Sequence, residues 1–220
     1  MVESKPHRPS LAWWQLLSYR QTWGFAAGKF LTDPVWWFFL FWLPLYFSTN
    51  FNRSLSGLAL PLVVVYVLST VGSVFGGWLP RGYVRMGMAL KPARLAAMLT
   101  CACLVVPVAF AGGLHSMWTA VAVVSLAASA HQGWSANIFT TVSDMFPHEY
   151  VGTVVSIGQV AGALGGAILQ VVAGYIRQST HNFVPLFFGR PKPVNHDAPR
   201  FRISGTAAIV STLLIVVGQE

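Results

Sequence analysis

Long apolar segments separated by short polar ones make up most of the chain. An α-helix rises about 1.5 Å per residue, so roughly 20 apolar residues cross a hydrocarbon core about 30 Å thick. This pattern predicts an all-α integral membrane protein whose transmembrane bundle occupies 20–188. The predicted spans, the last of which begins but is then broken, are 23–47, 57–79, 95–111, 117–141, 151–176 and 183–188.

The chain changes character on either side of this bundle. Residues 1–19 end in the amphipathic stretch LAWWQLLSYR, which is typical of a helix at the membrane surface. These residues lack the charged, apolar and small-residue regions of a cleaved signal, so we expect nothing to be removed. Residues 189–220 form an atypical tail, because three prolines and four positive charges in GRPKPVNHDAPRFR interrupt the sixth helix. A short apolar run follows at 203–218.

Composition and charge agree with a membrane protein. Hydrophobic residues make up 55% of the chain and charged residues 9%, whereas a soluble domain has about 25% charged residues. The net charge is +8, and the positive residues fall between the spans. They do not form a basic stripe interleaved with aromatic residues, which argues against nucleic acid as a partner. Positive charges are dense in the loop PRGYVRMGMALKPAR and sparse in STNFNRS. The positive-inside rule therefore predicts an inner (plasma) membrane protein with the basic loop at 80–94 and the N-terminus in the cytoplasm, and with the turn at 48–56 outside.

The first span carries charge inside the membrane. Lys29 lies nine residues after Arg20, roughly 13 Å deep, and Asp33 follows one helical turn later on the same face. The two side chains can form an ion pair that only tolerates burial, or they can mark a substrate or proton pathway. Ionisable residues inside the membrane favour the functional interpretation.

Pro34 and two tryptophans extend this candidate site. A proline frees the carbonyl four residues earlier, here that of Phe30, and permits a bend. Trp36 and Trp37 follow too soon after Lys29 to belong to an interfacial belt. Either indole can stack against a sugar ring, and either can equally face lipid or the protein core.

The fourth span is polar in its second half, which reads SAHQGWSANIFTT. Small and hydrogen-bonding residues recur there every four positions, so they share one helix face. Packing against another helix is one explanation for this face. The alternative is a binding surface, for which the candidate residues are His131, Gln132, Trp134 and Asn137.

Glycines and one proline predict how the other spans pack. Gly72 and Gly76 on the second span, and the ladder Gly158, Gly162 and Gly166 on the fifth, permit close approach of neighbouring helices. Pro107 should kink the third span.

The sequence offers no enzymatic or metal-binding motif. Cys101 and Cys103 have no second pair at metal spacing, so they are interpreted as packing thiols, and we expect neither a metal nor a cofactor. No nucleophile, base and orienting group share a face, which makes a membrane enzyme the weakest hypothesis.

Three long motifs resemble a known family. GKFLTDPVWWFFLFWLPLYF, the basic loop after GGWLP, and HQGWSANIFTTVSDMFP followed by VGTVVSIGQVAGALGG are similar to the C-terminal half of bacterial hexuronate transporters. These belong to the anion:cation symporter branch of the major facilitator superfamily. The resemblance implies that the five spans correspond to the seventh to eleventh helices of a twelve-helix carrier that imports galacturonate, glucuronate or a related acid with protons. It implies lipid, a sugar-acid anion and an N-terminal transporter half as partners.

Two departures from the family matter for function. The N-terminal half is not in this sequence, and with it are missing the charged helices to which the resemblance assigns most anion binding and proton coupling. The tail after Phe188 replaces the family's continuous twelfth helix. We expect the chain to be part of a carrier, with a frameshift as one explanation of its tail. The first hypothesis is half of a proton-coupled sugar-acid carrier. The second is a non-transporting membrane remnant or packing subunit.

Overall fold

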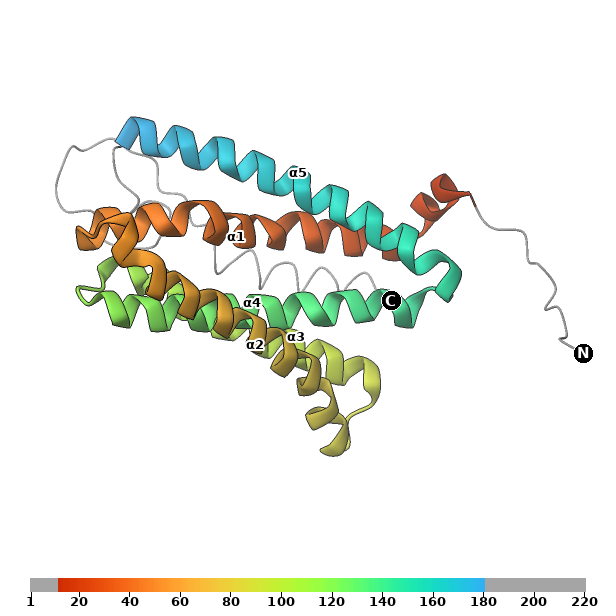
Figure 1. Ribbon diagram of the computed structural model, residues 1–220. Coiled ribbons are helices and arrows are strands. Elements are labelled where there is room, and N and C mark those ends of the chain that lie inside the picture. The colour runs from red at the N-terminus through yellow and green to blue at the C-terminus, as the bar shows by residue number, and fades with distance from the viewer. Residues whose placement is uncertain (1–11, 181–220) are drawn as a thin grey trace, which may run out of the picture.

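The computed structural model describes residues 12–180. The predicted sixth span, the tail at 189–220 and the first eleven residues lie outside this range. Within it the chain forms helices joined by short turns (Figure 1). In chain order these are η1 (Trp13–Ser18), α1 (Arg20–Phe51), η2 (Leu55–Leu58), α2 (Ala59–Arg85), α3 (Leu90–Val105), η3 (Val106–Gly113), α4 (Met117–Met145) and α5 (His148–Thr180), where η denotes a 3₁₀ helix.

Four helical stretches in the described part are long and apolar enough to cross a membrane. They are Arg20–Phe51, Ser56–Arg85, Leu90–Val108 and His148–Tyr175. α4 has 29 residues, which is also long enough, but its second half carries the polar residues noted above. The observed helices contain the apolar runs that the sequence pattern marked, and together they describe an all-α membrane bundle.

Prolines act differently in the two helices where the sequence drew attention to them. α1 stays α-helical from Arg20 to Phe51 although it contains Pro34 and Pro44, and it ends where Asn52 adopts a left-handed conformation. The third span instead leaves the α-helix at Val105 and continues as the 3₁₀ helix η3, with Pro107 in its first turn. A proline removes an α-helical hydrogen bond, so the tighter 3₁₀ winding is a physically reasonable continuation there.

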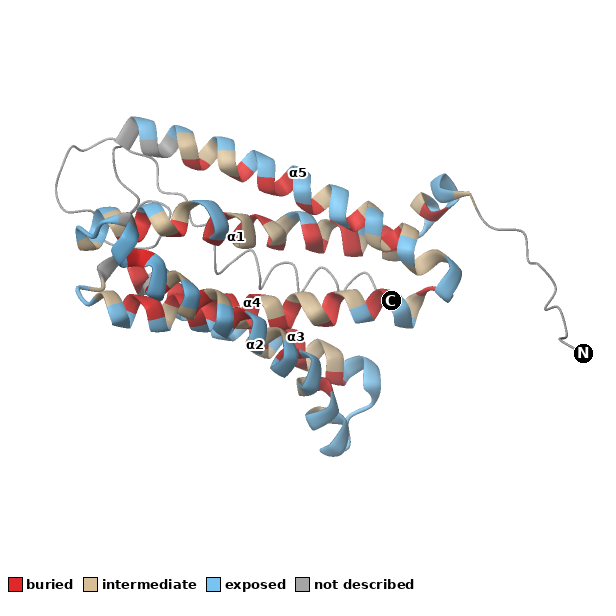
Figure 2. Cartoon of the chain, viewed as in Figure 1, coloured by how far each residue is buried: buried red, intermediate tan, exposed pale blue. Residues whose placement is uncertain are grey.

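The helices form two groups that meet along α1 and α4. Figure 1 shows α5 beside α1 in one group, and α2 and α3 with α4 in the other. Buried residues lie on the sides of the helices that face one another, while exposed residues cover the outer faces of α2 and α5 (Figure 2). α4 lies between α1, α2 and α3 and carries many of the buried residues. Because its polar side chains face these helices and not lipid, α4 can carry a row of polar residues along one face.

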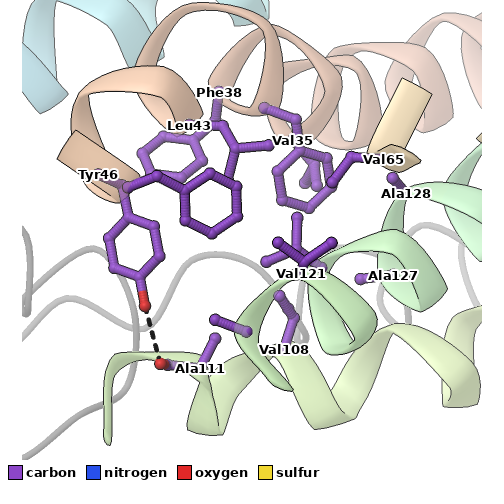
Figure 3. Close-up of a cluster of buried hydrophobic side chains, with 14 of the residues drawn as sticks. Val35, Phe38, Leu43, Tyr46, Val65, Val108, Ala111, Val121, Ala127 and Ala128 are labelled. Atoms are coloured by element: carbon purple, nitrogen blue, oxygen red, sulfur yellow. Dashed lines mark hydrogen bonds between the residues drawn. The ribbon is translucent and has the colours of Figure 1, made fainter. Parts of the chain in front are cut away.

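A cluster of buried apolar side chains fills one end of the interface between these groups (Figure 3). Val35 and Leu43 of α1 meet Val121 of α4 there. The hydroxyl of Tyr46 donates a hydrogen bond of 2.8 Å to the carbonyl oxygen of Ala111 in η3. A buried phenol needs such a partner, and this bond anchors the end of α1 to the end of the third span.

The seam between α2 and α4 depends on small residues. A Cβ at Gly72 would overlap Ser129, and a Cβ at Gly76 would overlap the backbone of Gly133. The Ser129 hydroxyl donates a hydrogen bond of 2.7 Å to the carbonyl oxygen of Leu68. The prediction that these glycines allow close approach is confirmed, because the two backbones touch where side chains are missing.

The glycine ladder of α5 packs against α1. A Cβ at Gly158 would overlap the Phe25 ring, and one at Gly166 would overlap the Trp37 indole. Gly165 lies against the carbonyl oxygen of Phe30, the group that Pro34 deprives of its helical donor. The ladder therefore lets α5 approach α1 closely enough to cover an unsatisfied backbone oxygen, where the glycine Cα hydrogens can serve as weak donors.

Candidate functional site

Lys29 and Asp33 form the charged centre of the molecule. Lys29 is only 3% exposed, and its Nζ lies 2.7 Å from Oδ1 of Asp33, one helical turn further along α1. The Asp33 side chain keeps 16% of its surface accessible, four times the 4% of the Lys29 side chain. The sequence predicted this pair from its spacing, and a charge so far from water requires such a partner.

An aromatic ring from α4 covers the ammonium group. Nζ of Lys29 lies 4.4 Å from the centroid of the Phe139 ring, within the range of a cation–π interaction. Phe139 itself meets Phe25 edge to face, with ring centroids 6.1 Å apart. The ammonium is thus held between a carboxylate on its own helix and a polarisable ring on the neighbouring one.

A stacked pair of rings also joins α1 to α4. The Trp36 indole stacks on the His131 imidazole, with ring centroids 6.2 Å apart and planes within 5° of parallel. Tyr66 of α2 meets Trp36 edge to face at 6.4 Å. His131 is only 4% exposed. Its ring therefore lies between helices and not in solvent, and Trp36 links three helices at this level.

Three of the predicted site residues thus gather where α1 faces α4: Lys29, Trp36 and His131. Asp33 pairs with Lys29 from the side of α1 that packs on Gly162 of α5. Trp37 lies elsewhere, because its indole packs on Gly166 of α5 and stacks on Phe41 at 5.7 Å. Gln132 is partly buried on α4.

Trp134 and Asn137 have the contacts of packing residues. Trp134 is 2% exposed and belongs to a cluster with Met98 and Cys101 of α3. The side-chain nitrogen of Asn137 donates to the carbonyl oxygens of Gly76 at 2.7 Å and Gly133 at 2.8 Å. Both amide hydrogens are used in the α2–α4 seam, which agrees with the packing explanation of this polar face.

Two neighbours of the charged pair were missed at the sequence level. Phe139 follows His131 by eight residues, just over two helical turns, so its position on the same face was available from the spacing. Gly162 was assigned only to packing, yet a Cβ there would overlap the carboxylate of Asp33. That contact depends on which helix lies beside α1, which no local pattern reveals.

The charged centre offers one ammonium group and one flat aromatic face. Within residues 12–180, no three His, Cys, Asp or Glu side chains gather as a metal site. The ammonium of Lys29 can form a charge-assisted hydrogen bond to a carboxylate, and the Trp36 indole offers a flat apolar face.

These helices and this buried ion pair describe a multi-pass membrane protein with a polar centre between its helices. The sequence model of the Major Facilitator Superfamily matches residues 2–169, and the chain belongs to that superfamily. It is similar to curated sugar-acid transporters.

Three of these relatives show the range of similarity. The hexuronate transporter of Escherichia coli K12 is 28% identical over 174 residues, which cover 79% of this chain and 40% of that protein. The D-galactonate transporter of E. coli O6:H1 is 26% identical over 178 residues, covering 78% and 40%. The galacturonate transporter of Dickeya chrysanthemi is 33% identical over 67 residues, covering 30% and 19%. The chain spans about two fifths of the length of the first two of these relatives.

Proposed function

We propose that this chain forms the C-terminal half of a secondary carrier for sugar acids such as galacturonate or glucuronate, in the inner membrane of a bacterium. The observation that carries the proposal is the Lys29–Asp33 pair on α1, whose ammonium faces Phe139 of α4 and whose carboxylate faces Gly162 of α5. The relatives also support the proposal, because three of them are named as transporters of hexuronate, D-galactonate and galacturonate, which are all sugar carboxylates. With the N-terminal half, the chain would enclose a substrate site near the membrane midplane.

In this proposal Lys29 binds the substrate carboxylate. The ammonium has one carboxylate partner, Asp33, on a flexible side chain that a second carboxylate can replace. Phe139 would keep the ammonium in place during the exchange, since its ring attracts a cation without neutralising it. The Trp36 face, already paired with His131, is the surface on which the apolar side of the sugar ring would stack.

Transport would follow from rocking of the two halves about this site, with protons as the coupling ion. A single half provides only one wall of the site, so we expect the chain to bind sugar acids weakly and not to move them. The N-terminus would lie in the cytoplasm. The competing proposal is a remnant that packs in the membrane through its glycine seams and binds no sugar acid.

A binding measurement separates these two proposals. The purified chain in lipid nanodiscs is titrated with D-galacturonate and, as a matched control, with D-galactose, which lacks the carboxylate. Losing a charge-assisted hydrogen bond costs about 1.5–3 kcal/mol, so we expect galactose to bind at least about tenfold more weakly. Equal affinity for the two sugars, or no binding of either, would contradict a sugar-acid site.

A transport measurement addresses the carrier itself. The chain is co-expressed with a matching N-terminal transporter half in cells that lack hexuronate uptake. Restored galacturonate uptake, absent with either half alone, is the expected result. If the N-terminal half co-purifies with the chain but the cells take up no galacturonate, the result would support the packing-subunit proposal.

A further inference from the structure

Asp33 has a single charged partner in the described structure. Its Oδ1 accepts from Lys29, while a Cβ at Gly162 on α5 would overlap its Oδ2. The α5 residue that lies against this oxygen is thus a glycine, which has no side chain to donate a hydrogen bond or a charge. The carboxylate is neutralised from within its own helix.

Two titratable groups contact Trp36, which follows Asp33 by three residues on α1. His131 of α4 stacks on that indole, and Tyr66 of α2 meets its edge. Among residues 12–180, no basic side chain other than Lys29 forms an ion pair with Asp33. When Lys29 changes partner, no second cation in this part of the chain is placed to replace it.

We propose that Asp33 is a proton-binding site whose protonation is coupled to anion binding at Lys29. This inference rests on the proposed function. In the empty site, the Lys29 ammonium pairs with the Asp33 carboxylate. A sugar carboxylate then takes over the ammonium, and Asp33 binds one proton from water at the oxygen that Lys29 has left. One anion and one proton enter together, so the net charge of the site stays zero.

The physical reason is the cost of an isolated buried charge. Breaking a buried ion pair by removing one partner costs about 3–5 kcal/mol, because the remaining charge has lost its compensation. A carboxylate that loses its cation in a weakly polar site avoids this cost by taking up a proton. The Asp33 side chain keeps 16% of its surface accessible, so the carboxylate is not sealed between the helices of this chain.

The test counts protons during binding. The whole chain in nanodiscs is titrated with D-galacturonate by calorimetry at one pH, in two buffers with different ionisation enthalpies. The difference in heat gives the number of protons bound per anion, and we expect one when Asp33 starts ionised. Affinity should also fall about tenfold for each pH unit above the pKa of the empty site, since binding that takes up a proton weakens as pH rises.

Two variants assign the proton to a residue. Asp33→Asn carries a neutral side chain already, so its affinity should no longer depend on pH and its proton count should be zero. His131→Gln removes the imidazole that stacks on Trp36, and its proton count should stay at one even if its affinity is lower. A count that persists in Asp33→Asn, or disappears in His131→Gln, would overturn the assignment.

A third measurement needs no ligand. Infrared spectroscopy of Lys29→Gln should show a protonated carboxylic acid that is absent in the double variant Lys29→Gln with Asp33→Asn. Absence of that band would mean that Asp33 stays ionised without Lys29, which overturns the inference. Binding of galacturonate with no proton uptake by the original chain overturns this inference alone, whereas no binding at all overturns the proposed function with it.

Discussion

The side-chain amide of Asn137 on α4 donates a hydrogen bond of 2.7 Å to the carbonyl oxygen of Gly76 on α2. Gly76 has no Cβ, which lets α4 come close enough for this bond to form. The same amide nitrogen also donates to Gly133 within α4. The polar stripe of α4 thus holds α2 in place, and the two helices act as one unit behind the charged site.

Asn137→Ala is therefore expected to affect stability more than binding. The change leaves the buried carbonyl of Gly76 without its side-chain donor, which costs about 1–3 kcal/mol. Unfolding of the purified protein in detergent should show this loss, while galacturonate affinity per folded molecule should change little. An affinity loss of tenfold or more at unchanged stability would instead place Asn137 in the binding site.

Two neighbouring glycines on α2 give a matched pair of variants. A Cβ at Gly76 would overlap the Cα of Gly133, whereas a Cβ at Gly77 would meet nothing within 4 Å. Gly76→Ala should force the helices apart and cost about 1–3 kcal/mol. Gly77→Ala should be neutral or stabilise by about 0.5–1 kcal/mol, because alanine favours the helix. Similar unfolding curves for the two variants would remove close contact from the explanation of this seam.

The glycine ladder of α5 predicts a second contrast. Gly162→Leu places a side chain where the Asp33 carboxylate lies, so it should lower stability and also disturb the ion pair. Leu164→Ala removes an exposed side chain two residues away and should do neither. Thermal unfolding and galacturonate binding of both variants measure the contrast. Equal behaviour would show that α5 does not fix the position of Asp33.

Topology can be tested with two engineered cysteines. The basic loop between α2 and α3 should face the cytoplasm and the turn after α1 should face outside. In a background with Cys101 and Cys103 replaced by serine, an impermeant thiol reagent added from outside should label Asn52→Cys and not Arg85→Cys. The reverse pattern would invert the orientation proposed for the whole chain.

The hydrophobic pattern was sufficient to locate the helices because burial in lipid depends mainly on local composition. Their ends were harder to predict. α1 continues from the predicted limit at Phe47 to Phe51, since a helix can extend beyond the hydrocarbon core until a residue such as Asn52 turns the backbone. The surface helix expected before α1 is, over the described residues, the six-residue 3₁₀ helix η1.

The site was predictable only where it depends on one helix. Lys29 and Asp33 are four residues apart on α1, so their pairing follows from helical geometry alone. The role of Asn137 could not be decided in that way, because its helix face suits both a ligand and another helix. The contact between Asp33 and Gly162 joins residues on α1 and α5, and only the tertiary arrangement reveals it.

The Lys29–Asp33 pair is proposed to be a binding site and not only a structural ion pair. The most direct measurement is galacturonate binding by the double variant Lys29→Ala with Asp33→Ala, in which no buried charge is left alone. Stability of this variant should be close to that of the original chain, since both members of the pair are removed together. A Lys29→Arg variant keeps the positive charge and should retain measurable binding.

We expect the double variant to be folded and to have lost galacturonate binding, because the group that neutralises the carboxylate is absent. A folded double variant that binds galacturonate as tightly as the original chain would show that the pair is only architectural.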